Sequence, residues 1–358
     1  MQSMGERIKQ ARLAAGLSLR ELAERVDVSA MALSKYENSQ VLPGSDMLLR
    51  LGKALGVKVG YFLRPLQVEV QCPAFRKHSK VTKKAQGMIE GRIREFLERY
   101  LAAEDVFEPD RMPVFEWPES CSGTLKSVEE AEQWAEGLRR DWGLGHDPIA
   151  NLCETLEDHG VKVILLEDVD EKFDGYSCWA NETIPVVACR KGDGLPGDRQ
   201  RFTLAHELGH LLLEKHMAED VDAEKACHRF AGAFLVPAEA VRREVGSHRG
   251  RIEFKEIHSL KHKWGLSMAA WFHRLADLDI ISANQYQIIA RRFRASGWSK
   301  REPGEQVRPE QTQRFERLVE RAVAEDIISV SRAADLLNTS LIELRGEMGW
   351  PKPEVAGV

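Results

Sequence analysis

Residues 203–213 read Thr-Leu-Ala-His-Glu-Leu-Gly-His-Leu-Leu-Leu and contain the spacing His-Glu-x-x-His. Side chains four positions apart lie on one face of an α-helix, roughly 6 Å apart along its axis. His206 and His210 can therefore offer two imidazoles to one ion, and Glu207 can reach a water bound to it. Two neutral imidazoles on Zn²⁺ beside a carboxylate base are typical of zinc peptidases. The leucines of this stretch form an apolar side that could seat such a helix in a core. The alternative is a chance match on an ordinary buried helix.

A catalytic zinc needs a third protein ligand and one open position for water. His216 stands where the pattern H-E-x-x-H-x-x-G-x-x-H places its third histidine, but the glycine that this pattern requires is replaced here by leucine. On a continuous helix His216 would point roughly 120° away from His210, about 9 Å further along the axis. We therefore favour Glu224 as the third ligand. It lies on a second expected helix, over 222–237, that can run antiparallel to the first. The alternative for Glu224 is an ordinary acid on a solvated helix face. His228, one turn later, could orient Glu224, stabilise an oxyanion or replace Glu224 as ligand.

Length and composition describe an ordinary protein of two or three domains. The 358 residues carry a net charge of -5, so any contact with nucleic acid has to be local. No apolar leader and no run of about 18 apolar residues is present, so no membrane contact is expected. Six scattered cysteines without a C-x-x-C pair indicate reduced thiols and a cytoplasmic location.

The first 66 residues read as five short helices separated by helix-ending and helix-starting signals. Gly16 ends the first helix, Ser18 and Glu21 form a capping box for the second, and Ser29 caps the third. The expected helices cover about 4–15, 19–26, 29–38 and 45–56, with a last turn at 61–63. The second and third helices, joined by a tight turn, predict a helix-turn-helix.

Residues 16–23 and 28–38 resemble the XRE, phage-repressor type of helix-turn-helix domain. The resemblance implies that residues 29–35 face the major groove of DNA. It places Ser29, Met31 and Ser34 near bases, and Lys35 and Asn38 near phosphates. Residues 1–64 carry ten Lys/Arg against six Asp/Glu, an excess that suits phosphate contact. The alternative is a helical module that binds protein.

Residues 67–125 are expected to form a linker and a long helix. The basic run at 75–84 could extend a DNA footprint or act as a solvated connector. Thr82 is expected to cap the long helix, which continues to about Ala103. Capping signals then predict a helix from Ser127 to about residue 141 and another from Asp147 to about residue 159.

Three strands are expected at 161–166, 175–180 and 184–189, before the His-Glu-x-x-His helix that Asp198 is expected to cap. They predict a small, largely antiparallel sheet that forms one wall of a cleft. Tyr176 is a candidate for contacting substrate or a developing oxyanion, against the plainer interpretation of an aromatic in a sheet.

Residues 130–240 resemble the ImmA/IrrE metallopeptidases. The similarity rests on the His-Glu-x-x-His spacing and on the stretch from Glu224 to Pro237, with Cys227 and His228 where alanine and asparagine are usual. The resemblance implies a zinc endopeptidase with a thermolysin-like, zincin-type core, which cleaves a repressor or antitoxin in response to a signal. Fusion to a repressor-like domain is a known arrangement for this family.

The C-terminal region is expected to be helical. Residues 265–270 look like a turn into a helix, a second pair of helix-turn-helix type. Residues 298–309 are polar, with glycine and proline, and are expected to be a linker. A small helical unit at 328–348 could bind a partner or cover the peptidase core.

Together these patterns predict a mainly α protein with a small β-sheet (α+β). The expected parts are 1–66 for DNA binding, 67–125 as linker, 126–245 as the peptidase, and a helical 246–358. We predict a DNA-associated, zinc-dependent endopeptidase with one Zn²⁺ per chain. Its expected substrate is a repressor or antitoxin, cleaved in a stress, phage or mobile-element response. The protein could form a homodimer. In this hypothesis His206, His210 and Glu224 hold the metal and Glu207 activates water. The rival hypothesis is a transcriptional regulator whose peptidase-like part senses metal or ligand without proteolysis.

Overall fold

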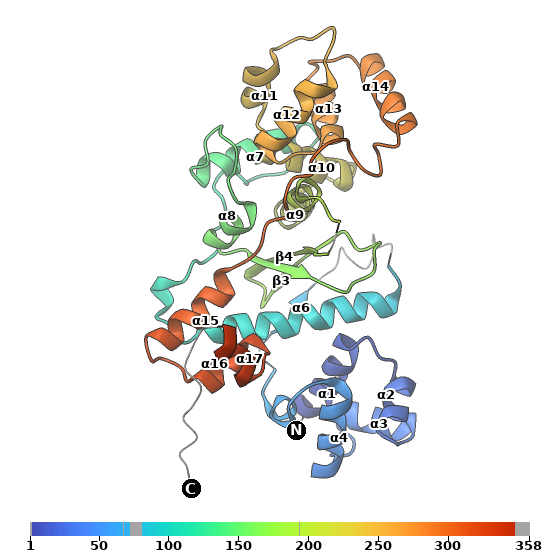
Figure 1. The fold of residues 1–358 in the computed structure, drawn as a ribbon, viewed down its shortest axis with the longest axis vertical. Helices are drawn as coiled ribbons and strands as arrows, with labels where there is room; N and C mark the ends of the chain where they lie inside the picture. The colour runs from blue at the N-terminus through green and yellow to red at the C-terminus, as the bar shows by residue number, and fades with distance from the viewer. Residues whose placement is uncertain (1, 67, 72–80, 193, 348–358) are drawn as a thin grey trace. The chain divides into compact units, whose positions relative to one another are not determined.

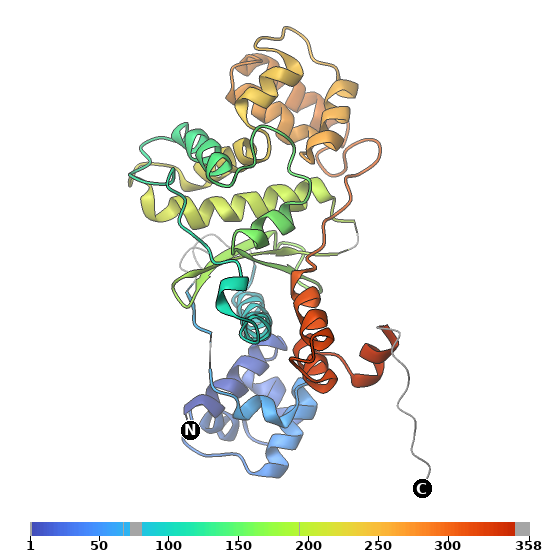
Figure 2. The same ribbon diagram turned by 90° about the vertical axis from the view of Figure 1, so that its left-hand side faces the viewer.

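The computed structural model describes residues 2–66, 68–71, 81–192 and 194–347 (Figures 1 and 2). Its contacts divide the chain into two units. Unit 1 comprises Met1–Val70, Lys80–Pro113 and Gln313–Val358, and unit 2 comprises Gln71–Ser79 and Val114–Thr312. The expected C-terminal region 246–358 is therefore divided near residue 312, because its last helices bury their apolar faces in unit 1.

Unit 1 begins with a helical bundle around one small core. Its elements are α1 (Gln2–Ala14), α2 (Leu19–Arg25), α3 (Ala30–Glu37), α4 (Ser45–Leu55) and η1 (Val59–Leu63). Leu22, Leu33 and Phe62 are fully buried in this core. The buried Arg12 donates to both carboxylate oxygens of Glu37, at 2.6 and 3.0 Å, and so ties α1 to α3.

The turn between α2 and α3 has the predicted helix-turn-helix form. Ser18 and Glu21 make the capping box at the start of α2, and Ser29 accepts a hydrogen bond from the backbone of Ala32 at the start of α3. Between the helices Asp27 adopts a φ of 54°, in the left-handed region where aspartate is tolerated better than most residues. The expected helices are confirmed here to within two residues.

The rest of unit 1 is built on the long helix α6 (Lys83–Glu104), which begins at its predicted cap Thr82. The short η2 (Pro109–Arg111) follows, and the chain returns as α15 (Arg314–Ala324), α16 (Val330–Leu337) and α17 (Leu341–Glu347). Tyr100 of α6 stacks on Phe315 of α15 with ring centroids 5.5 Å apart. This second core explains why the last helices belong with unit 1. Residues 75–80 of the basic run lie outside the described residues.

The α16–α17 pair repeats the geometry of α2–α3. Ser329 caps α16, Asn338 takes a φ of 55° between the helices, and Ser340 accepts a hydrogen bond from the backbone of Glu343 at the start of α17. The spacing of these positions equals that of Ser18, Asp27, Ser29 and Ala32. The expected small C-terminal helical unit thus shares the capping and turn pattern of the helix-turn-helix, with Ile342 86% exposed at the position that matches Met31.

Unit 2 places helices against a four-stranded sheet. Strand β3 (Gly175–Ala180) pairs antiparallel with β4 (Ile184–Arg190), which pairs in parallel with β2 (Lys162–Leu166). The sheet is therefore mixed rather than largely antiparallel. The chain passes from β2 to β3 across β4, and this crossover leaves β2 parallel to β4. The two-residue strand β1 (Val70–Gln71) is the fourth strand of this sheet and lies next to β3.

The helices of unit 2 share one large core with the sheet. They are α7 (Glu130–Asp141), α8 (Leu152–Asp158), α9 (Gly197–Leu213), η3 (Glu214–His216), α10 (Ala223–Leu235), α11 (Ala238–Val245), α12 (Phe254–Trp264), α13 (Met268–Asp277) and α14 (Ala283–Ala295). The expected turn into a helix at 265–270 is confirmed, since Gly265 is left-handed and Ser267 caps α13.

Three expected helix starts in unit 2 are wrong. Helix α7 begins after Glu129 rather than Ser127, and α8 begins after Asn151 rather than Asp147. Asp198 lies within the first turn of α9 instead of capping it, because its carboxylate pairs with the buried Lys261 at 2.9 Å.

The stretch 298–309 was expected to be a linker, but it is anchored along the helices of unit 2. Gly197 donates to the carbonyl of Val307 at 2.7 Å, and Glu302 accepts from the first backbone N–H groups of α13. Glu310, just after the stretch, pairs with Arg201.

The described cysteines are buried and free, which agrees with reduced thiols: Cys121, Cys153, Cys178, Cys189 and Cys227. Cys72 lies outside the described residues. Within those residues, no helix combines the length and apolarity that spanning a membrane requires.

Candidate metal centre

Helices α9 and α10 approach closely enough to bring three candidate ligands together. A Cβ atom at Gly209 would lie 3.2 Å from the ring of Phe230 and 3.4 Å from Cys227, so the glycine suits the close packing of α9 on α10. The turn after η3 reverses the chain, and Asp222 caps α10 by accepting from the backbone of Lys225. The first turn of α10, which carries Glu224, thereby faces the two histidines of α9.

The ligand atoms converge on one point. The Nε2 atoms of His206 and His210 are 3.0 Å apart. The carboxylate of Glu224 lies 3.5 Å from the Nε2 of His206 and 3.7 Å from the Nε2 of His210. Tetrahedral zinc with metal–ligand distances near 2.1 Å separates its ligands by about 3.4 Å. These three residues therefore fit one zinc ion.

The contacts around His210 support the same interpretation. Its Nδ1 lies 2.8 Å from a carboxylate oxygen of Glu214, four residues later at the start of η3. A carboxylate on the far nitrogen of a metal-binding histidine fixes the tautomer and orients the ring. The Nδ1 of His206 is buried and has no hydrogen-bond partner among the described protein groups.

Charge in the cluster is distributed unevenly. The hydrogen bond from His206 lowers the pKa of Glu224 to about 2, so this carboxylate is ionised at neutral pH. Burial acts to lower the pKa of His210, but the hydrogen bonds to Cys227 and Glu214 outweigh it and raise the pKa to about 11. A metal has to displace the proton on this ring, so zinc binding is expected to release a proton.

His228 lies at the edge of the same cluster. Its ring centroid is 4.5 Å from that of His206 and 5.5 Å from that of Phe202. Burial and the neighbouring His206 lower the pKa of His228 to about 4, so the ring is neutral and able to donate or accept one hydrogen bond. His206, Glu224 and His228 also have ligand atoms within 4.8 Å of one another, which keeps His228 open as an alternative ligand.

Glu207, the predicted general base, lies between the two histidines in the sequence of α9. It is buried between α9 and the sheet, and one oxygen accepts a hydrogen bond from the hydroxyl of Ser177 at 2.7 Å. Burial raises its pKa above the ordinary value, although His210, His206 and the Ser177 hydrogen bond act to lower it. A raised pKa suits a carboxylate that takes up and returns a proton near neutral pH.

Gly175 allows β3 to approach Glu207 this closely. A Cβ atom there would lie 2.6 Å from the Oε1 of Glu207 and 2.6 Å from the Cγ2 of Thr203. Sequence reasoning did not single out Gly175, Ser177 or Glu214. The His210–Glu214 spacing of four along a helix was a usable signal for Glu214, whereas nothing in the sequence pairs β3 with residue 207.

Two sequence candidates lie elsewhere. The Nδ1 of His216 is 3.1 Å from the carbonyl of Gly123, and the ring packs beside Trp117, so His216 does not join the cluster. Tyr176 is 1% exposed on β3 and, by the alternation of a strand, faces away from the side on which Ser177 reaches Glu207.

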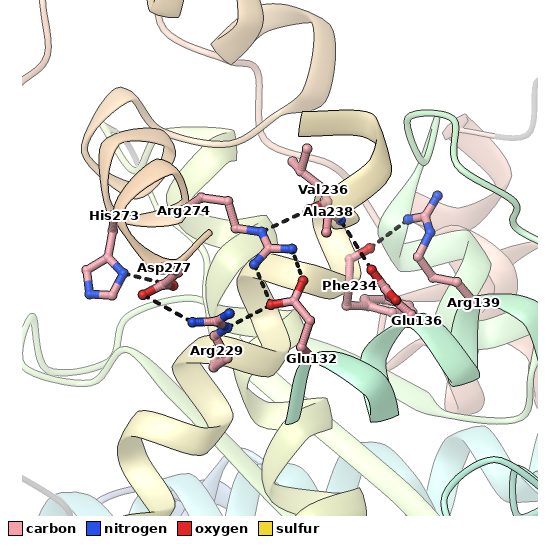
Figure 3. A network of polar contacts seen from close by, with 10 residues as sticks. All are labelled: Glu132, Glu136, Arg139, Arg229, Phe234, Val236, Ala238, His273, Arg274 and Asp277. Carbon is pink, nitrogen blue, oxygen red and sulfur yellow. Dashed lines mark hydrogen bonds and ion pairs between the residues drawn. The ribbon is translucent and has the colours of Figure 1, made fainter. Parts of the chain in front are cut away.

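A polar network fixes the end of α10 opposite Glu224 (Figure 3). Glu132 of α7 accepts from Arg274 of α13 and from Arg229 of α10, the latter at 2.7 Å. Arg274 also donates to the carbonyl of Val236 at 3.0 Å, and Arg139 donates to that of Phe234 at 2.6 Å. These donors satisfy the carbonyls that a helix leaves unpaired at its C-terminus. The network therefore holds α10 between α7 and α13.

The predicted DNA-facing residues lie together on α3 of unit 1. Met31 is 72% exposed, and Lys35 and Asn38 are exposed as well. The Nδ2 of Asn38 donates to the hydroxyl of Ser34 at 3.2 Å, and the hydroxyl of Ser29 is occupied in capping the helix. The surface that these residues form is accessible, and their base and phosphate contacts remain a prediction.

Comparison with known proteins identifies both parts of the chain. Residues 8–62 match the helix-turn-helix family, and residues 156–276 match the IrrE N-terminal-like domain. A stretch of 61 residues is 38% identical to the HTH-type transcriptional regulator ImmR of Bacillus subtilis (strain 168), covering 17% of this chain and 48% of that protein. The match thus spans about half the length of that relative. Both expected resemblances are confirmed: an XRE-type DNA-binding domain is fused to a domain of the IrrE-type peptidase family. All the candidate metal ligands lie within the second domain.

Proposed function

We propose that the chain is a DNA-binding, zinc-dependent endopeptidase that cleaves a regulatory protein such as a repressor or antitoxin. The observation that carries the proposal is the convergence of His206, His210 and Glu224 within 3.7 Å, with Glu207 buried beside them. Zn²⁺ held by these three residues would lower the pKa of a bound water and polarise a peptide carbonyl.

The protein's own groups would supply the proton transfers. Glu207 takes the proton of the attacking water and returns it to the nitrogen of the departing amine. Ser177 holds one oxygen of Glu207 by its 2.7 Å hydrogen bond and so restrains the carboxylate beside the cluster. His228, which is neutral and lies next to His206, would donate a hydrogen bond to the substrate oxygen that becomes negative.

The helix-turn-helix supplies location rather than chemistry. An exposed α3 of repressor type would bring the peptidase to a promoter or to a target that is itself bound to DNA. The substrate then belongs to the proteins that act on nearby DNA, which is why repressors and antitoxins are the substrates we propose.

The test combines cleavage with metal analysis. Wild-type protein and Glu207→Gln are incubated with repressors encoded by neighbouring genes, with and without a chelator, and zinc per chain is measured. Glu219→Gln is the matched control, because Glu219 is exposed. Without chelator, we expect about one zinc per chain in the wild type and in both variants. Cleavage should be lost only in Glu207→Gln and when the chelator is added. Zinc and promoter binding without cleavage would instead support a regulator that senses metal or ligand.

A further inference from the structure

A cavity of about 460 Å³, which we call the side chamber, opens next to the metal cluster within unit 2. Phe202 of α9 and His228 of α10 form part of its lining. The ring of His228 also lies 4.5 Å from that of His206, so a single side chain separates the chamber from a metal ligand. The volume falls in the range of cavities that bind small organic groups.

The chamber walls suit a bulky apolar group. Small residues on one side, Gly232, Ala269 and Ala270, leave room, while Phe293 and Trp298 contribute aromatic surface. Apolar surface of this kind favours the burial of a large hydrocarbon or aromatic side chain.

One wall is held in place before anything binds. It is formed by residues 298–306, and Glu302 fixes it by accepting hydrogen bonds from the backbone of Met268 and Ala269 at 3.0 Å each. The fully buried Lys261 pairs with Glu302 at 2.8 Å and with Asp198 at 2.9 Å. A pre-formed wall lowers the ordering entropy that binding must overcome.

The charges that remain uncommitted at the chamber are positive. Glu302 and Asp198 are engaged by Lys261, and the third lining carboxylate, Asp277, contacts His273 at 3.1 Å. Lys300 and Arg301 also line the chamber, are exposed, and have no acidic partner among the described residues. The chamber can therefore attract an acidic group beside the apolar one.

We propose that the side chamber is the subsite that receives a bulky apolar side chain of the protein substrate, with an adjacent acidic residue of the substrate held by Lys300 and Arg301. The chamber lies within one side chain of the metal cluster, so a residue next to the cleaved bond can reach it. The inference rests on the proposed peptidase function, because it assigns the substrate sequence for that same site.

The first test measures binding without turnover. Full-length Glu207→Gln is titrated with N-acetyl-Phe-Glu-amide, N-acetyl-Ala-Glu-amide and N-acetyl-Phe-Lys-amide by ligand-observed NMR. We expect the first probe to bind at least about tenfold more tightly than the other two, because loss of a matched apolar or charged contact changes affinity by this order. Equal affinities for the three probes would overturn the proposal.

Two variants test the location. Ala270→Phe fills the chamber and should remove the preference for the aromatic probe, whereas Ala295→Phe, on α14 outside the chamber, should keep it. Lys300 and Arg301 are exposed, so both can be replaced by glutamate without disturbing the core. This double variant should reverse the preference between the acidic and basic probes. Lys255→Glu with Arg291→Glu is its control, with the same change in charge at exposed positions outside the chamber. An unaltered preference in either chamber variant contradicts the assignment.

Cleavage mapping separates this inference from the proposed function. If a target is cut but its cleavage sites lack a bulky residue next to an acidic one, the peptidase proposal stands and the chamber assignment fails. If no target is cut while the probe preferences hold, the chamber stands as a binding site and the peptidase proposal fails.

Discussion

Replacing Glu132 by glutamine is expected to lower the free energy of unfolding of unit 2 by about 3 kcal/mol. The carboxylate accepts from Arg274, whose side chain is 1% exposed, and from Arg229, whose side chain is 14% exposed (Figure 3). Glutamine keeps the size of the side chain but leaves the buried guanidinium of Arg274 without its counter-charge. Removing one partner of a buried ion pair typically costs about 3–5 kcal/mol.

The lower end of that range applies because both arginines retain one other partner. Arg274 still donates to the carbonyl of Val236 at 3.0 Å, and Arg229 still lies 3.5 Å from Asp277. Glu136→Gln is the matched control on the same helix, because in Figure 3 Glu136 accepts a single 3.3 Å hydrogen bond, from the backbone of Ala238, and contacts no arginine drawn there. We expect the control to lose less than about 1 kcal/mol.

Denaturation of the full-length chain by urea, followed by tryptophan fluorescence, measures the effect. Trp264 and Trp271 are almost fully buried in unit 2, so their emission reports the unfolding of this unit. A loss below about 1 kcal/mol for Glu132→Gln, or a loss equal to that of Glu136→Gln, would refute the reasoning. Replacing Glu132 and Arg274 together by leucine and methionine should recover part of the loss, because no unpaired charge then remains.

The same carboxylate predicts the direction of a pH effect. Burial acts to raise the pKa of Glu132, but Arg274 and Arg229 outweigh it, so the folded-state pKa lies below the ordinary value of 4.5. A depressed folded pKa gives a stabilisation that is fully present above the unfolded pKa and is lost as the pH falls through the folded one. The stability gap between wild type and Glu132→Gln should therefore be constant from pH 7 to about 5.5 and narrow below about 4. A gap that widens in acid would contradict this assignment.

Three further predictions concern the metal cluster and the DNA-binding helix. Glu214→Gln should weaken zinc affinity about 10–100-fold, measured against a chromophoric chelator, because the ring of His210 loses its orienting carboxylate; unchanged affinity would exclude this role. Gly175→Ala should reduce kcat while leaving the zinc content unchanged, because the added Cβ would lie 2.6 Å from the Oε1 of Glu207; unaltered turnover would show that the carboxylate can move without consequence. Lys35→Glu should weaken binding to all DNA sequences alike and reduce the slope of log affinity against log salt by about one; a sequence-dependent loss would instead place Lys35 near bases.

Local patterns predicted the parts of the chain that short-range physics controls. The capping signals at Ser18, Ser29 and Thr82 fixed three helix starts, because a cap bonds to backbone only three residues away. The predicted cap at Asp198 was wrong, because Asp198 pairs with Lys261, 63 residues later in the chain. A side chain with a strong distant partner does not act as the cap that its neighbourhood suggests.

The amino-acid sequence by itself determined that His206 and His210 share one helix face with Glu207 beside them, because side chains four positions apart on a helix lie on the same face. It also determined the helix-turn-helix, whose caps and turn are local. Only the tertiary structure decided which acid joins the histidines, because Glu224 reaches them through the close packing of α9 on α10 at Gly209. The contact of Ser177 with Glu207 and the side chamber likewise depend on segments that are distant in the chain. Such contacts follow from how whole elements bury their apolar faces, which no short stretch of sequence encodes.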